Sequence, residues 1–140
     1  RLTDPLGHLV EVAHGITPVQ AGEARTEALP VNTPLRKERL SRTQRPASQP
    51  SPVFALGHCA LGTPRFEDVA IWYMQHLGLI PTDVECLPNG EPCIAFLRTD
   101  RGAEPSDHHA MVIGTGLVDE FLHCAFEVVD IDALGQGQQA

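Results

Sequence analysis

No stretch of about 18 consecutive apolar residues occurs in this chain of 140 residues, so a membrane-spanning helix is not expected. The N-terminus has no basic start followed by an apolar run, so a signal peptide is not predicted either. Basic residues are few, because ten Lys and Arg stand against 18 Asp and Glu, for a net charge of −8. Since phosphate backbones bind basic surfaces, nucleic acid is not expected as the main partner.

Cysteines are also sparse, and no Cys-x-x-Cys pair occurs. The four cysteines are Cys59, Cys86, Cys93 and Cys124. This number and spacing argue against a disulfide framework and against a four-cysteine zinc site. We therefore expect buried thiols in a protein of a reducing, cytoplasmic compartment.

The chain divides into parts of different composition. Residues 15–52 contain six prolines and no periodic apolar spacing, which predicts a linker. Before it, residues 1–14 predict a turn at Asp4–Gly7 followed by a strand. After it, residues 51–140 contain three basic and 13 acidic side chains. Because the chain starts at Arg1 and ends within an expected helix, we expect a piece of a longer protein.

The pattern from residue 53 onward predicts a β-α-β-β-β unit that begins to repeat. Residues 53–62 alternate as a strand, and Thr63 is the expected N-cap of a helix with Pro64 at its first position. Apolar residues then recur at helical spacing as far as Gly78, the expected helix end. Strands are predicted at 80–87, 93–99 and 108–114, then a further strand at 121–128 and a helix start at Asp130.

The tripeptide His-Cys-Ala occurs in both opening strands, as His58 to Ala60 and as His123 to Ala125, which suggests a duplicated module. Neighbours on a strand point to opposite faces, so the cysteine faces are assigned to helix packing. On the strand at 121–128, Cys124 shares its face with the apolar residues Leu122, Phe126 and Val128. His58 and His123 would then line the opposite, concave side, where two imidazoles suit a divalent first-row metal. The alternative is that each is a half-buried structural histidine.

A second pair of histidines, His108 and His109, precedes an apolar strand segment. Strand alternation would let only one of them face a given site. A histidine beside a metal can act as a general acid or base, since its ordinary pKa lies near 6.5. A histidine pair at the surface is the alternative, and the pattern alone leaves both open.

Several segments together resemble the type I extradiol ring-cleavage dioxygenases of the vicinal oxygen chelate superfamily. They are Leu56-Gly-His-Cys-Ala-Leu, the helix from Phe66 to Leu79, Ile94-Ala-Phe-Leu-Arg, Asp107-His-His and Phe121-Leu-His-Cys-Ala-Phe-Glu-Val. The resemblance covers residues 53–140. It implies an α+β fold of βαβββ modules, with a full module at 53–118 and the start of a second at 119–140, in a mixed sheet that forms an open barrel. Residues 1–14 then resemble the closing strand of a preceding domain.

The resemblance also implies site residues and an activity. His58 and His123 resemble two ligands of Fe(II), or of Mn(II), and His109 resembles the acid–base histidine beside them. Ala60 and Phe96 resemble positions that line the substrate pocket. The implied reaction is O2-dependent cleavage of a catecholic ring next to its diol. The third ligand of this family is a glutamate on a strand beyond residue 140, and Glu11 is only a remote candidate.

Three other functions remain open at this stage. One is a glyoxalase-type isomerase or a thiol transferase of the same fold. Another is a non-enzymatic ligand-binding protein that uses the cavity without metal. The third is an inactive structural piece whose open sheet edges pair with another copy, so that a homo-oligomer is expected.

Overall fold

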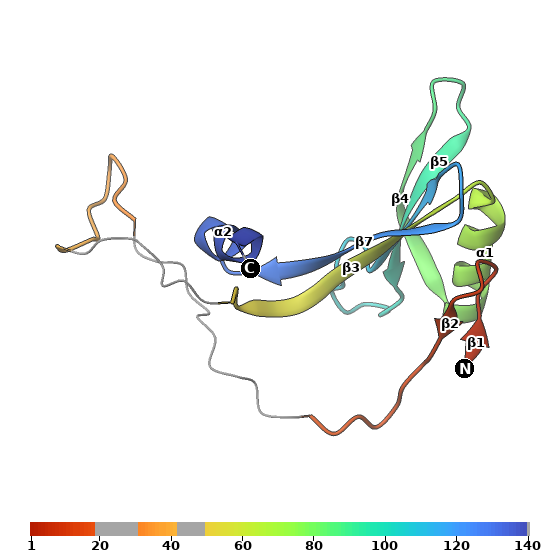
Figure 1. The fold of residues 1–140 in the computed structure, drawn as a ribbon, viewed down its shortest axis with the longest axis horizontal. Helices are drawn as coiled ribbons and strands as arrows, with labels where there is room; N and C mark the ends of the chain where they lie inside the picture. Colours follow the sequence, from red (N-terminus) through yellow and green to blue (C-terminus); the bar gives the residue numbers. More distant parts are fainter. Residues whose placement is uncertain (19–30, 42–49, 140) are drawn as a thin grey trace. The chain divides into compact units, whose positions relative to one another are not determined.

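The computed structural model describes residues 1–18, 31–41 and 50–139. Its elements are two short strands, β1 (Leu2–Thr3) and β2 (Leu9–Val10), then β3 (Val53–Thr63), α1 (Phe66–Leu77), β4 (Leu79–Cys86), β5 (Pro92–Thr99), β6 (Met111–Thr115), β7 (Glu120–Val128) and α2 (Ile131–Gln139) (Figure 1). The predicted β-α-β-β-β order from residue 53, followed by a further strand and helix, is confirmed. None of the helices in the described ranges is long and apolar enough to span a membrane.

The chain forms two compact units, residues 1–17 with 57–125, and residues 18–56 with 126–140. The main sheet has five strands in the order β4-β5-β6-β3-β7. β4 pairs antiparallel with β5, and β5 antiparallel with β6, whereas β6 pairs in parallel with β3. The sheet is therefore mixed, and together with the helices it gives the α+β class that was expected. A parallel pair needs a crossover connection, and α1 lies in the chain that connects β3 to β6.

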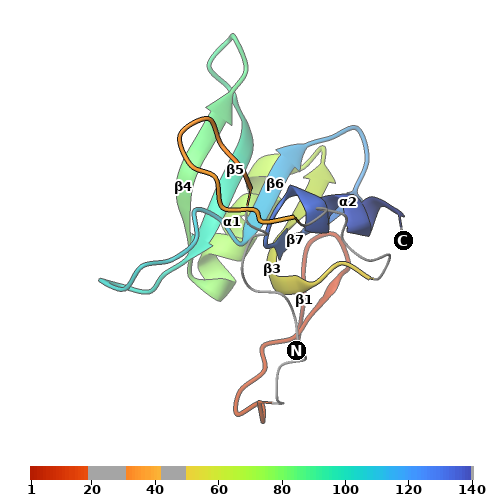
Figure 2. The same ribbon diagram turned by 90° about the vertical axis from the view of Figure 1, so that its left-hand side faces the viewer.

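Helix α1 covers one face of the sheet, and the core of the first unit lies beneath it (Figure 2). The side chains of Val69, Leu97 and Ile113 are fully enclosed there. The helix ends as predicted, because Gly78 adopts a left-handed conformation with φ of 66° that closes the last turn. The packing of alternate strand residues against α1 therefore determines which residues are left for the opposite face.

The predicted N-cap at Thr63 is wrong. Thr63 is the last residue of β3, where it pairs with Thr115 of β6, and the helix starts only after a turn. Its hydroxyl accepts a hydrogen bond from the amide of Arg65 at 3.0 Å and donates one to Asp119 Oδ1 at 2.6 Å. The hydrogen bond donated by Thr63 and a second one from the Arg65 side chain lower the pKa of Asp119. Thr63 thus connects the end of β3 to the loop before β7 instead of capping the helix.

The segment before the linker folds as a β1–β2 hairpin that belongs to the same unit as α1. The predicted turn is present, since Asp4 Oδ1 accepts hydrogen bonds from the amides of Leu6 at 3.0 Å and His8 at 2.7 Å. The other carboxylate oxygen, Oδ2, accepts a hydrogen bond from the hydroxyl of Tyr73 in α1 at 2.7 Å. Arg65 donates to the carbonyl oxygen of Pro5 at 2.8 Å. A buried hydrogen bond from Tyr73 of α1 and an exposed one from Arg65, just before the helix, therefore attach the hairpin.

The second unit contains α2, which packs beside residues 51–53 and the end of β7. Ser51 Oγ donates a hydrogen bond to the carbonyl oxygen of Ala133 at 2.6 Å, and Asp130 Oδ1 accepts one from the amide of the same residue at 2.9 Å. Asp130 thus caps the helix start that the sequence predicted. Phe126, Val128 and Leu134 line a cavity of about 470 Å³ within this unit.

Candidate metal-binding site

The two histidines of the repeated tripeptide come together although 65 residues separate them. His58 on β3 and His123 on β7 place their Nε2 atoms 3.1 Å apart. Their rings meet edge to face, with centroids 5.2 Å apart. The side chain of His123 is exposed and that of His58 is half-buried, so solvent reaches this pair from the side of β7. The two strands are neighbours in the sheet, which is why equivalent positions of the repeat can meet.

A third histidine completes the cluster. The ring of His109 lies 4.4 Å from the ring of His58, centroid to centroid, with the planes inclined by 48°. Phe96 on β5 contacts the same imidazole at a centroid distance of 5.1 Å. The pKa of His109 is lowered, chiefly by partial burial and further by the neighbouring His58 and His108. A lowered pKa keeps this imidazole neutral at neutral pH, when it can accept a proton.

The strand alternation that was expected to separate His108 from His109 is wrong. The Nδ1 atoms of the two residues lie 3.0 Å apart, and the ring of His108 also approaches Phe96, with centroids 5.8 Å apart. The reason is that β6 begins at Met111, so residues 108–110 form a bend instead of the predicted strand, and alternation does not apply to them. His108 is therefore a residue of the cluster that the sequence argument omitted.

The two expected pocket residues lie in one row across the sheet. Ala60 of β3 pairs with Val112 of β6, which pairs in turn with Phe96 of β5. Because residues paired in register share a face, Ala60, Val112 and Phe96 lie on the same face of the sheet. His58 lies two positions before Ala60 on β3, so its side chain is on that face too. Ala60 is almost fully buried, and the other two are half-buried. Val112 was not predicted from the sequence, because only the strand register reveals it.

Glu11 lies apart from the histidine cluster. Its carboxylate forms an ion pair with Arg1, and its side chain lines a cavity together with Cys59 and Met111 on the α1 side of the sheet. Within residues 1–18, 31–41 and 50–139, no three His, Cys, Asp or Glu side chains are grouped so that they could hold a metal ion. The described part of the chain thus provides two converging imidazoles and no carboxylate beside them.

The cysteines only partly follow the expectation of buried thiols in helix packing. Cys59 packs against the core under α1, and burial raises the pKa of its thiol, with a smaller contribution from Cys124. Cys124 itself is exposed. Cys86 is also exposed, at the end of β4. All four cysteines are free thiols.

Comparison with known proteins shows that this chain is similar to extradiol ring-cleaving dioxygenases. The resemblance inferred from the sequence motifs is thereby confirmed. In sequence, the chain is 29% identical over 136 residues to metapyrocatechase 2 of Cupriavidus necator, and the match covers 96% of this chain. It spans 38% of the length of that protein, so the chain corresponds to part of this relative. No protein-family profile matches the chain.

Solved structures show the same fold. Homoprotocatechuate 2,3-dioxygenase of Brevibacterium fuscum, in complex with 3,4-dihydroxyphenylacetate, superposes with a TM-score of 0.53 at 18% identity, covering 68% of this chain and 27% of that protein. A room-temperature structure of an extradiol ring-cleaving dioxygenase from the same organism gives a TM-score of 0.53 at 17% identity, covering 70% and 25%. The match is to about a quarter of each longer chain.

Proposed function

We propose that this chain is part of an extradiol dioxygenase, which cleaves a catecholic aromatic ring next to its diol with O2 at an Fe(II) site. The observation that carries the proposal is the 3.1 Å separation of the Nε2 atoms of His58 and His123, with His109 beside them. The similarity to metapyrocatechase 2 over 136 residues supports it independently.

The two imidazoles fit a metal ion of this kind. With metal–nitrogen distances of about 2.0–2.1 Å, two ligands in adjacent coordination positions lie roughly 3 Å apart. His58 and His123 would therefore hold Fe(II), or Mn(II), as adjacent ligands. The carboxylate that completes such a site would come from residues outside the described part of the chain. The metal would bring the catechol and O2 together in one coordination sphere and activate both.

The residues around the metal ligands would handle the substrate and its protons. His109 would accept a proton from the catechol hydroxyl at its free ring nitrogen and return it later, since its lowered pKa keeps the imidazole neutral. The Nδ1 contact with His108 would orient that ring. Ala60, Val112 and Phe96 would form the apolar floor against the aromatic ring, with the small side chain of Ala60 leaving space for it.

The domain division also belongs to this proposal. Residues 53–118 would form one βαβββ module and residues 119–140 the start of a second, in a sheet that continues into an open barrel. Residues 1–14 would be the closing strand of a preceding domain and residues 15–52 a linker, of which 19–30 and 42–49 lie outside the described residues. The whole protein would be a cytoplasmic homo-oligomer, a location that the free thiols favour.

An anaerobic Fe(II) titration of this chain tests the two proposed ligands, with His123→Ala as the test variant and His76→Ala as the control. His76 lies on α1, stacked on Trp72, away from the cluster. We expect Fe(II) binding that disappears in His123→Ala and persists in His76→Ala. Equal binding by both variants would contradict the assignment of His58 and His123 as ligands.

The activity is tested on the longer polypeptide that contains this chain. Oxygen uptake and formation of a ring-opened semialdehyde would be followed with a panel of catechols, beside turnover of methylglyoxal hemithioacetal. Semialdehyde formation that requires His58 supports the dioxygenase. Turnover of the hemithioacetal alone would favour the glyoxalase-type isomerase, and ligand binding without turnover or bound metal would favour the non-enzymatic binding protein.

A further inference from the structure

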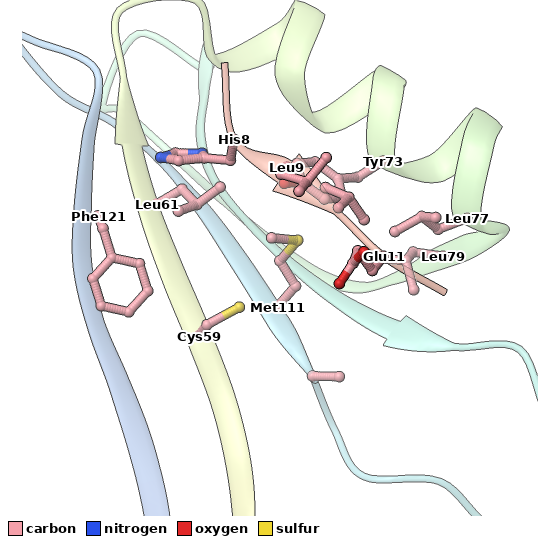
Figure 3. A pocket seen from close by; sticks show the side chains of 12 residues that line it. His8, Leu9, Glu11, Cys59, Leu61, Tyr73, Leu77, Leu79, Met111 and Phe121 are labelled. Atoms are coloured by element: carbon pink, nitrogen blue, oxygen red, sulfur yellow. The ribbon is translucent and has the colours of Figure 1, made fainter. Parts of the chain in front are cut away.

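A second cavity lies between the β1–β2 hairpin, α1 and strands β3, β6 and β7 (Figure 3). Its volume is about 620 Å³, within the range of cavities that bind small organic molecules. Cys59, Tyr73, Met111 and Phe121 line it from the sheet and the helix, and Leu9 lines it from the hairpin. All these residues belong to one compact unit.

This cavity is separate from the proposed metal site. Cys59 follows His58 on β3, and because strand neighbours point to opposite faces, the thiol lies under α1 while the imidazole lies on the other side. Cys59 pairs in register with Met111 of β6, so the two sulfur-containing side chains share the α1 face. None of His58, His109 and His123 is among the residues that line the cavity, so a ligand here would not contact the proposed metal ligands.

The charges around the cavity exclude anionic ligands. Within the described residues, the lining includes no Lys or Arg, and its acidic member, Glu11, already forms an ion pair with Arg1. Residues 51–140 carry ten more acidic than basic side chains, which repels anions further. His8 also lines the cavity, and its Nδ1 atom lies 3.1 Å from the carboxylate of Asp4, so this histidine already has an acidic partner. The described lining therefore offers no unpaired cationic group to the carboxylate of a fatty acid or the sulfonate of a dye.

The side chains around the cavity favour aromatic rings. Sulfur atoms make favourable contacts with ring edges, and Cys59 and Met111 present two of them to the same space. The rings of Tyr73 and Phe121 can pack in offset or edge-to-face contact with a further ring. Phe121 is 56% exposed, so a flat ligand beside it would remove its ring from water. The volume exceeds what a single ring would fill.

We propose that this cavity binds an uncharged aromatic compound of two or three fused rings, at a site distinct from the histidine cluster. The ligand lies between the hairpin and the sheet, against Cys59, Met111 and Phe121, with Leu9 covering it. Binding depends on desolvation of these side chains and requires no metal and no conversion of the ligand. The inference does not rest on the proposed dioxygenase activity.

The test is fluorescence titration of the chain with N-phenyl-1-naphthylamine, an uncharged aromatic probe, followed by competition with phenanthrene and with dodecanoate. Leu9→Glu introduces a charge at the cavity, and Leu117→Glu introduces the same charge at a residue that is 96% exposed and does not line it. We expect at least about a tenfold weaker affinity in Leu9→Glu and little change in Leu117→Glu. Phenanthrene should displace the probe, and dodecanoate should not.

The position of the ligand is tested by alkylation of the cysteines with iodoacetamide, followed by mass spectrometry of peptides. Phenanthrene should slow the modification of Cys59 and leave the rates at Cys86 and Cys124 unchanged, because neither of these lines the cavity. Equal loss of probe affinity in both glutamate variants, stronger competition by dodecanoate, or unchanged reactivity of Cys59 would each overturn the proposal. None of these measurements depends on enzymatic activity.

Discussion

The imidazole rings of His58 and His109 lie with their centroids 4.4 Å apart, although one belongs to β3 and the other to the bend before β6. Cys59 donates its amide hydrogen to the carbonyl oxygen of Ala110 at 3.2 Å, so a backbone hydrogen bond joins the residues that follow the two histidines. The positions of the two rings are thus determined by the parallel pairing of β3 with β6.

This arrangement separates the roles of the histidines by mutation. His109→Ala should leave metal binding by His58 and His123 intact, because it removes neither of the two converging Nε2 atoms. Turnover in the longer protein should fall by about 10²- to 10⁴-fold, the usual contribution of general acid–base catalysis. Metal content and steady-state rates measured on the same preparation check this, with His76→Ala as the control. Loss of metal from His109→Ala would make it a ligand or a structural residue.

The contact between Tyr73 and Asp4 should contribute to stability. The hydroxyl of Tyr73 donates a hydrogen bond of 2.7 Å to a carboxylate that is fully enclosed, and removing it leaves a buried acceptor with one partner fewer. Tyr73→Phe should therefore lower the free energy of unfolding by about 1–3 kcal/mol. Urea denaturation monitored by circular dichroism measures this. A change below about 0.5 kcal/mol would contradict a stabilising role of this hydrogen bond.

The same carboxylate predicts a dependence of stability on pH. Burial by itself would raise the pKa of Asp4, but hydrogen bonds from Tyr73 and His8 outweigh it and hold that pKa below the ordinary value of 3.8. A lowered pKa in the folded state means that the contribution is fully present above pH 3.8 and is lost as the pH falls through the folded-state pKa. Denaturation midpoints between pH 2 and 6 should thus fall less steeply on acidification in Asp4→Asn than in the unmodified chain.

Asp83→Asn is the matched control for this pH series. Asp83 is exposed on β4, and its Oδ1 accepts a hydrogen bond from the amide of the next residue, Val84. This variant should keep the pH dependence of the unmodified chain. The linkage argument fails if Asp4→Asn and Asp83→Asn follow the same profile.

Two glycine replacements should have opposite effects. Gly78 closes α1 with φ of 66°, where a side chain is strained even though nothing lies within 4 Å of its position, so Gly78→Ala should destabilise the chain by about 1 kcal/mol. Gly135 lies within α2, where an added Cβ would also meet nothing within 4 Å and the backbone is not left-handed. Gly135→Ala should therefore raise the stability of the helix by up to about 1 kcal/mol. Thermal unfolding followed at 222 nm measures both. The same sign in both variants would contradict the argument.

The sequence was sufficient to predict the succession of strands and helices and the faces of β3, because alternation and helical spacing are local properties. The repeated tripeptide also predicted that His58 and His123 meet. Local patterns were insufficient at Thr63 and His108. The hydroxyl of Thr63 bonds to Asp119, a partner far along the chain, and the alternation rule failed at His108 because the strand begins later than its apolar residues suggested. The position of Val112 between Ala60 and Phe96 depends on the register of three strands, which the sequence of one segment does not determine.

The wide separation of His58 and His123 in sequence has a consequence for the order in which the chain folds. β4 and β5 are joined by a short turn, closed by a hydrogen bond from the amide of Leu87 to the carbonyl oxygen of Glu91 at 2.8 Å, so this hairpin can form early. The pairing of β3 with β7 must close a loop of 65 residues, at a much larger entropic cost. We therefore expect the two imidazoles to meet late, after the helix has packed. Pulsed hydrogen exchange should protect amides of β5 before those of β7.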